Sequence, residues 1–225
     1  MAPKVATFDC YGTLVDWEGG LGAFLYTLML REGVADPPPG RELRERWEAI
    51  QFEVIQGSYR SYKEVLSESV LAWCREFGVP DRDVYGGALV DSMRAWQPFH
   101  DTRPALQRVR ETGVRLAILS NTDRDIISHT LKQIGVPFDD VITAEDVGAY
   151  KPSLAGFEQL LERLGEDPAD IVHVAFGFKY DIGPAKQVGM GSAWVNRHEE
   201  PLPDPDTVPD HEWRDLWGLA ELATS

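Results

Sequence analysis

KVATFDCYGTLVD, residues 4–16, is a short apolar run that ends in a carboxylate and leads into a glycine-containing turn. Its first six residues include β-branched and aromatic side chains, which favour a buried β-strand. The pattern therefore predicts a strand over residues 4–9, with Asp9 at its carboxyl end and Gly12 in the turn that follows.

Outward from this stretch, further strands alternate with helices from about residue 100 onward. Apolar runs predict strands at 114–120, 140–144, 171–176 and 192–196, and helical spacing predicts helices at 103–112, 124–135 and 154–165. Gly135 and Gly165 read as C-terminal stops of the last two helices. This alternation predicts an α/β fold, a Rossmann-like doubly wound parallel sheet with helices on both faces.

The segment between the first two strands has a different pattern of apolar residues. Residues 20–33, 43–57, 62–78 and 84–96 carry apolar side chains at helical spacing, with no strand between them. A helical block inserted there favours a cap over the site, and a peripheral helical layer without function is the alternative. We therefore expect a core domain of residues 1–15 and 98–225 and a four-helix cap domain of residues 16–97. Asp9 then lies at the strand ends where such sheets bind ligands.

The composition narrows the classes of partner. The 225 residues carry a formal net charge of −15, the wrong sign for binding nucleic acid or an anionic membrane through the overall field. We expect neither partner. The first residues lack the pattern of a signal peptide, no apolar run is long enough to span a membrane, and Cys10 and Cys74 form no disulfide framework or zinc set. These features predict a cytoplasmic protein.

Four short segments that follow predicted strands carry the chemistry. They are Asp9–Asp16 (DCYGTLVD), Ser120-Asn121, Tyr150-Lys151-Pro152 and Phe176–Asp181 (FGFKYD). A carboxylate at a strand end can attack carbon or phosphorus, and a lysine nearby would keep it ionised. Thr13, Ser120 and Asn121 supply short donors that could orient carboxylate oxygens. Taken singly, these residues could equally be helix caps or solvated charges.

Together and in this order, the segments resemble the haloacid dehalogenase superfamily over nearly the whole chain. Its phosphatases have Asp two residues after the nucleophile and a late acidic pair that holds Mg²⁺. Here those positions hold Tyr11 and Phe176, so two of the expected carboxylates are missing. The DxYGTL motif is instead similar to the metal-independent L-2-haloacid dehalogenases. The resemblance therefore implies no metal and no cofactor.

The resemblance also implies roles for particular residues. Asp9 would displace halide from C2 of a small 2-haloacid, such as a haloacetate or L-2-halopropionate, to give an ester that water then hydrolyses. Asp181 would orient or deprotonate the water, Lys151 would pair with Asp9, and Thr13, Ser120 and Asn121 would hold the carboxylates and the leaving group. A cap arginine, Arg44 in preference to Arg41, would face the halide or the substrate carboxylate. The further substrate-binding residues implied are Tyr11, Phe157, Phe176, Phe178 and Tyr180.

Phe176 and Phe178 depart from the family, which usually has Ser and Asn at these positions. If the two rings face the site they shrink and dry it, which favours a haloacetate; the alternative is that they are core contacts. The departure is also compatible with a related hydrolase, such as one that opens azetidine-2-carboxylate, or with a catalytically vestigial binding protein. A Mg²⁺ phosphatase is a further alternative, because members of the superfamily tolerate some loss of motif residues. Dimers are common among relatives, and the apolar cap helices could supply a homodimer interface.

Overall fold

β1 (Val5–Phe8) lies inside a six-stranded sheet, in the computed structural model of residues 2–225. The strand order is β3-β2-β1-β4-β5-β6, and every pairing is parallel. The other strands are β2 (Arg115–Ser120), β3 (Asp140–Thr143), β4 (Ile171–Ala175), β5 (Gly191–Val195) and β6 (His211–Trp213). The chain runs from β1 outward to β3 and then returns to the other side of β1. The order therefore reverses between β1 and β4, as a doubly wound fold requires.

Alternate residues of the strands pack into two hydrophobic cores. Ala6 and Phe8 of β1 belong to the larger core, with α5 (Thr102–Glu111), α6 (Arg124–Ile134) and α10 (Trp217–Thr224). Val5 belongs to the smaller core on the opposite face, with α8 (Ala155–Leu164) and α9 (Gly183–Gln187). Because both faces are covered, the strands are apolar throughout rather than alternating. The short elements α7 (Ala144–Val147), η1 (Pro168–Asp170) and the π-helical turn η2 (Phe178–Ile182) complete this part.

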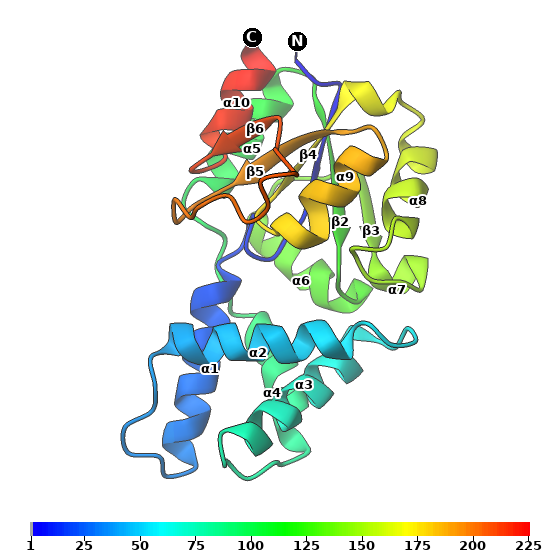
Figure 1. The fold of residues 1–225 in the computed structure, drawn as a ribbon. Helices are drawn as coiled ribbons and strands as arrows, with labels where there is room; N and C mark the ends of the chain where they lie inside the picture. The colour runs from blue at the N-terminus through cyan, green and yellow to red at the C-terminus, as the bar shows by residue number, and fades with distance from the viewer. Residues whose placement is uncertain (1) are drawn as a thin grey trace.

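Four helices lie between β1 and β2 in the chain: α1 (Trp17–Arg31), α2 (Gly40–Val54), α3 (Tyr62–Glu76) and α4 (Val84–Met93). They form a separate layer beyond one end of the sheet (Figure 1). The chain enters and leaves this layer at one place, because Asp16 N–H donates to Gln97 O and Phe99 N–H donates to Leu14 O. The two crossings are thus tied to each other by backbone hydrogen bonds.

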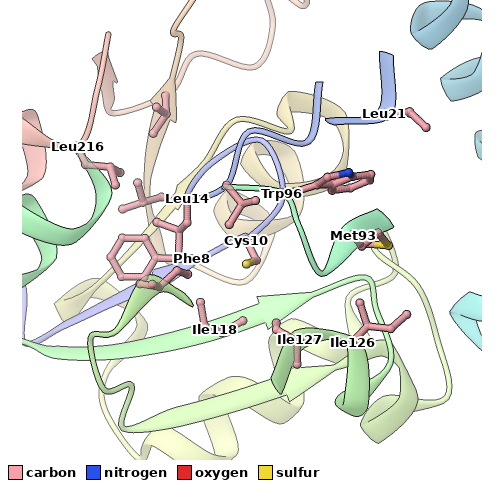
Figure 2. Close-up of a cluster of buried hydrophobic side chains, with 14 of the residues drawn as sticks. Phe8, Cys10, Leu14, Leu21, Met93, Trp96, Ile118, Ile126, Ile127 and Leu216 are labelled. Atoms are coloured by element: carbon pink, nitrogen blue, oxygen red, sulfur yellow. The ribbon is translucent and has the colours of Figure 1, made fainter. Parts of the chain in front are cut away.

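Apolar packing continues from the sheet into the helical layer. Figure 2 shows Phe8, Ile118 and Leu14 near the sheet, with Leu21 and Trp96 farther toward the helices. These side chains belong to one buried cluster. Removing apolar surface from water in one continuous cluster stabilises the two layers together. The helical layer is therefore packed against the sheet rather than held by its two connections alone.

The α/β fold class predicted from the sequence is confirmed. All five predicted strands are present within about two residues of their expected ends, and Gly135 and Gly165 end α6 and α8 in the left-handed conformation. The sixth strand, β6, was missed because it has only three residues, is half exposed and follows the Pro- and Asp-rich loop 199–210. Among residues 2–225, no helix combines the length and apolar character needed to cross a bilayer.

Candidate active site

The carboxyl ends of the central strands bring the predicted polar residues together. Asp9 follows β1, Ser120 ends β2, and Asp181 lies in the π-helical turn after β4. Lys151 comes from the loop between α7 and α8. Parallel strands present their carboxyl ends at one edge of the sheet, so residues up to 172 positions apart in the chain converge there.

Lys151 is the centre of this cluster. Its Nζ lies 2.9 Å from Asp9 Oδ1, 2.6 Å from Asp181 Oδ1 and 3.0 Å from the carbonyl oxygen of Leu119. The exposed fractions are 9% for Asp9, 3% for Lys151 and 1% for Asp181. All three donors of the ammonium are therefore used, in a site that is nearly closed to water. One cation faces two carboxylates.

The two carboxyl groups differ in acidity. Burial raises the pKa of Asp9, and the charge of Lys151 offsets only part of that effect. Burial also acts to raise the pKa of Asp181, but the charge of Lys151 and the hydrogen bond to His173 outweigh it, so that pKa is lowered. Burial acts to lower the pKa of Lys151, yet Asp181 and Asp9 together raise it above 10.5, so the lysine stays charged. Asp181 is the stronger acid because its Oδ1 meets two hydrogen-bonding partners.

The turn after β1 holds the second oxygen of Asp9. Thr13 Oγ1 donates to Asp9 Oδ2 at 3.1 Å and accepts from Phe176 N at 2.8 Å. Gly12 has φ of +94°, and a Cβ there would lie 2.8 Å from the ring of Phe176 and 2.6 Å from Trp17 Nε1. Both the positive φ and the close approach require glycine. The turn thereby brings the Thr13 hydroxyl into contact with Asp9.

Asn121 and Ser120 have different surroundings from the ones expected. Asn121 Nδ2 donates to Lys151 O at 3.0 Å, and its Oδ1 accepts from Lys151 N at 2.7 Å. The amide therefore holds the backbone of Lys151 rather than a carboxylate. Ser120 Oγ is buried and has no hydrogen-bond partner among the described residues.

The two candidate arginines of α2 differ in exposure and in partners. Arg44 is 11% exposed, contacts Glu18 at 2.8 Å, pairs with Glu48 and lies 5.9 Å from the centre of the Trp17 ring. Arg41 is exposed and pairs with Glu45 one turn along the same helix. The structure therefore does not bring Arg41 to the site. Arg44 faces the junction between the helical layer and the sheet, already paired with two carboxylates.

The predicted aromatic residues are also divided. Phe176 packs against the Gly12 turn beside Asp9. Phe178 instead meets Trp194 edge-on at 5.3 Å in a small apolar cluster, as a core contact would. Phe157 is fully buried in the smaller core.

Two tyrosines link the site region to other elements. Tyr180 contacts Phe52 of α2 edge-on at 5.6 Å, across the two layers. The hydroxyl of Tyr11 lies 2.8 Å from Thr130 Oγ1 on α6, and its ring meets Trp96. The hydroxyl of Tyr11 is therefore already occupied by Thr130.

His173 is the residue of this cluster that sequence reasoning missed. It is completely buried, its Nε2 lies 3.0 Å from Asp181 Oδ1 and its Nδ1 lies 2.8 Å from Thr7 Oγ1. The only signal in the sequence is that Thr7 and His173 each interrupt an apolar strand. The strand register, which pairs Thr7 with His173, joins the two.

Comparison with known proteins shows the family of the chain. A family model described as haloacid dehalogenase-like hydrolase matches residues 3–189 of the 225. The chain belongs to the haloacid dehalogenase-like hydrolases. Within this family, the chain is 26% identical over 226 residues to an (S)-2-haloacid dehalogenase of Pseudomonas sp. strain YL, covering 97% of this chain and 94% of that protein. It is also 26% identical over 214 residues to haloacetate dehalogenase H-2 of Moraxella sp. strain B, covering 92% of each.

Solved structures of haloacid dehalogenase-like hydrolases share the fold. A structure of the L-2-haloacid dehalogenase from Xanthobacter autotrophicus with chloropropionic acid covalently bound superposes with a TM-score of 0.83 at 21% identity. The match covers 100% of this chain and 99% of that one. The likeness extends over the sheet and the helical layer alike.

Proposed function

We propose that this haloacid dehalogenase-like hydrolase removes halide from short 2-haloacids by hydrolysis, with Asp9 as the nucleophile. The observation that carries the proposal is the buried contact of Lys151 Nζ with both Asp9 and Asp181, at 2.9 and 2.6 Å. The names of the relatives support the substrate class: they act on 2-haloacids and on haloacetate.

In the first step, an oxygen of Asp9 attacks C2 of the haloacid and the carbon–halogen bond breaks. The electron pair of that bond leaves with the halide, and an ester of Asp9 forms with inversion at C2. Such a displacement needs the attacking oxygen held in line with the breaking bond, about 3–3.5 Å from the carbon. Thr13 and Lys151 hold the two oxygens of Asp9 from different directions, which supports this positioning.

In the second step, water attacks the ester carbonyl carbon of Asp9 and gives one proton to Asp181. The bond between the carbonyl carbon of Asp9 and the oxygen attached to C2 then breaks. The departing alkoxide takes that proton from Asp181 and leaves as the 2-hydroxy acid. Asp9 is left as a carboxylic acid and releases its proton to solvent. The lowered pKa of Asp181 keeps it ionised and ready to accept a proton, while Lys151 stabilises the charge on the tetrahedral intermediate.

We further propose that residues 16–97 act as a cap. The hydrogen bonds between Asp16 and Gln97 and between Leu14 and Phe99 place both chain crossings together, which suits a hinge. Tyr180 against Phe52 and the Tyr150 hydroxyl donating to Arg60 O at 2.8 Å join the two layers around the site. Closure would exclude water during alkylation. Arg44 would meet the substrate carboxylate or the halide by exchanging one of its carboxylate partners.

The residues present do not fit the Mg²⁺ site of the family's phosphatases. A Mg²⁺ ion requires several oxygen ligands in near-octahedral array. Here Lys151 Nζ lies between Asp9 and Asp181, the Tyr11 hydroxyl contacts Thr130, and Phe176 contributes a ring. We therefore propose a reaction that proceeds without a metal.

The test is halide release from chloroacetate and from each enantiomer of 2-chloropropionate in the presence of EDTA. Wild-type protein should release halide, and Asp9→Asn should not. Asp36→Asn, which changes an exposed carboxylate, is the matched control and should behave as wild type. No halide from any substrate would reject the proposal. Phosphate-ester hydrolysis with Mg²⁺, or ring opening of azetidine-2-carboxylate, would then identify the chemistry instead.

A further inference from the structure

His173 is a buried titratable residue that the two steps above do not use. It lies in the middle of β4, with an exposed fraction of 0%. The register of β1 and β4 places it beside Thr7, and the edge of the Phe157 ring covers it with a centroid distance of 5.1 Å. A buried imidazole must satisfy both nitrogens, and here Thr7 and Asp181 do so.

The contacts of His173 show which of its nitrogens donates to Asp181. Thr7 Oγ1 donates to the carbonyl oxygen of Val172 at 3.5 Å and forms a hydrogen bond with Nδ1 at 2.8 Å. Nε2 lies 3.0 Å from Asp181 Oδ1, and an ionised carboxylate can only accept a hydrogen bond, so the hydrogen between them belongs to Nε2. His173 thus donates to Asp181, while Thr7 holds the other side of the ring.

This donation leaves one oxygen of Asp181 available. Oδ1 accepts from both Lys151 and His173. Oδ2 lies against Gly177, where a Cβ would come within 2.6 Å of it. Gly177 has no side chain that could cover Oδ2. Oδ2 is the oxygen that can receive a proton from water.

Lys151 cannot orient Asp181 alone, because it is shared with Asp9. When Asp9 becomes an ester it loses its negative charge, and the electrostatic attraction between Lys151 and the two carboxyl groups changes. The hydrogen bond from His173 does not depend on the state of Asp9. The neighbouring rings of Phe176 and Phe178 offer no side-chain hydrogen bond in its place.

We propose that His173 is a positioning residue for the hydrolytic step. Its Nε2–H, with the ring held at Nδ1 by Thr7, holds Asp181 Oδ1 toward Lys151 and keeps Oδ2 directed at the water that attacks the ester. This inference rests on the proposed function. It assigns the Thr7–His173 pair to ester hydrolysis and not to alkylation.

The experiment separates the two steps. In His173→Leu, the burst of halide should stay within about threefold of wild type, because Asp9, Thr13 and Lys151 are untouched. Turnover should fall by about 100-fold or more, in the range for loss of a general base, and the peptide containing Asp9 should carry the mass of the ester. His173→Gln offers an amide donor to Asp181 and should recover most of the turnover.

Thr7 supplies a milder, matched pair. Thr7→Val removes the hydroxyl with little change of shape and should slow turnover more than the halide burst, whereas Thr7→Ser should behave as wild type. Unchanged turnover in a folded His173→Leu, or equal loss of burst and turnover, would overturn the proposal. If His173→Leu does not fold, the Thr7 pair decides: equal turnover in Thr7→Val and Thr7→Ser would overturn it.

A measurement without substrate distinguishes failure of this inference from failure of the proposed function. NMR of protein labelled with ¹⁵N-histidine should show a hydrogen on Nε2 of His173 in wild type and a changed Nδ1 signal in Thr7→Val. A ring in wild type with no hydrogen on Nε2 would overturn the inference whatever the enzyme turns over. A wild-type protein with the Nε2 hydrogen but no halide release would instead reject the proposed function.

Discussion

Lys151 Nζ lies 2.6 Å from Asp181 Oδ1, closer than the 2.9 Å that separates it from Asp9 Oδ1. The pKa is lowered for Asp181 and raised for Asp9. The proposed nucleophile is therefore the less firmly ionised of the pair. The proposed alkylation removes the charge on Asp9 while Asp181 and Lys151 remain charged nearby.

The first prediction concerns the pH dependence of alkylation. Asp9 must be ionised to attack carbon, and its pKa is raised above 3.8, chiefly by burial. The rate of the halide burst should therefore be constant at neutral pH and fall as the pH is lowered, with a midpoint above 3.8. In Asp181→Asn a neighbouring negative charge is gone, so the midpoint should move to lower pH. Rapid-quench measurement of halide checks both, and a wild-type midpoint at or below 3.8 would contradict the assignment.

The second prediction uses Phe176 and Phe178 as a matched pair. Phe176 packs beside Asp9, whereas Phe178 packs against Trp194. Phe176→Leu should enlarge the site and raise the kcat/KM ratio of 2-chlorobutyrate to chloroacetate by about tenfold, since one methylene in a pocket contributes about 1–3 kcal/mol. Phe178→Leu should lower stability and leave that ratio unchanged. Equal shifts of the ratio in both variants would show that Phe176 does not bound the pocket.

The third prediction concerns Glu48 on α2. Burial raises the pKa of Glu48 to about 7, and the charge of Arg44 opposes the shift only in part. Because the folded pKa lies above the ordinary value of 4.5, this group's contribution to stability is greatest below pH 4.5 and is lost as the pH rises through about 7. Glu48→Gln removes this titration.

The Tm of Glu48→Gln relative to wild type should therefore rise between pH 5 and pH 8. Glu53→Gln, an exposed change on the same helix, serves as the control and should show a constant difference over that range. Thermal unfolding followed by circular dichroism measures both. A difference for Glu48→Gln that is independent of pH would mean that the carboxyl group titrates as it does in the unfolded chain.

The fourth prediction concerns the buried ion pair that supports the turn after Asp9. Arg197 donates to both oxygens of Asp101, at 3.0 and 3.1 Å, and to Thr13 O at 2.8 Å. Asp101 is completely buried, so Arg197→Met leaves an uncompensated charge and should cost about 3–5 kcal/mol of unfolding free energy. Urea denaturation at neutral pH measures the loss.

Arg214→Met is the control for this pair. Arg214 pairs with Glu199 on the surface, where an ion pair contributes about 0–1 kcal/mol. Burial acts to raise the pKa of Asp101, but Arg197 outweighs it and the pKa is lowered. The contribution of the Asp101–Arg197 pair to stability is therefore present above the ordinary pKa of Asp101. It is lost as the pH falls through the lower pKa that Asp101 has in the folded protein. Similar losses in the two variants would contradict the account of a buried pair.

Local patterns were sufficient for most of the fold. The apolar runs of β1 to β5 are long enough to be recognised without their partner strands. Gly135 and Gly165 end their helices because glycine adopts a positive φ without strain, which is a property of the residue itself. β6 was missed because a three-residue edge strand can be recognised only from its pairing with β5. The helical insertion was visible because helical periodicity is a property of neighbouring residues.

For the candidate site, the sequence indicated which residue types carry the chemistry, and the order of Asp9, Lys151 and Asp181 along the chain was enough to suggest a family. It could not decide which of Arg41 and Arg44 faces inward, or that Phe178 contacts Trp194 while Phe176 contacts the turn beside Asp9. Nor could it join Thr7 to His173 and Asp181. Periodicity, turn residues and strand ends are local properties, so the order of residues was enough to predict the elements and the acidic and basic groups at their ends. Strand register and the packing of distant segments decide which side chains meet, and these exist only in the tertiary structure.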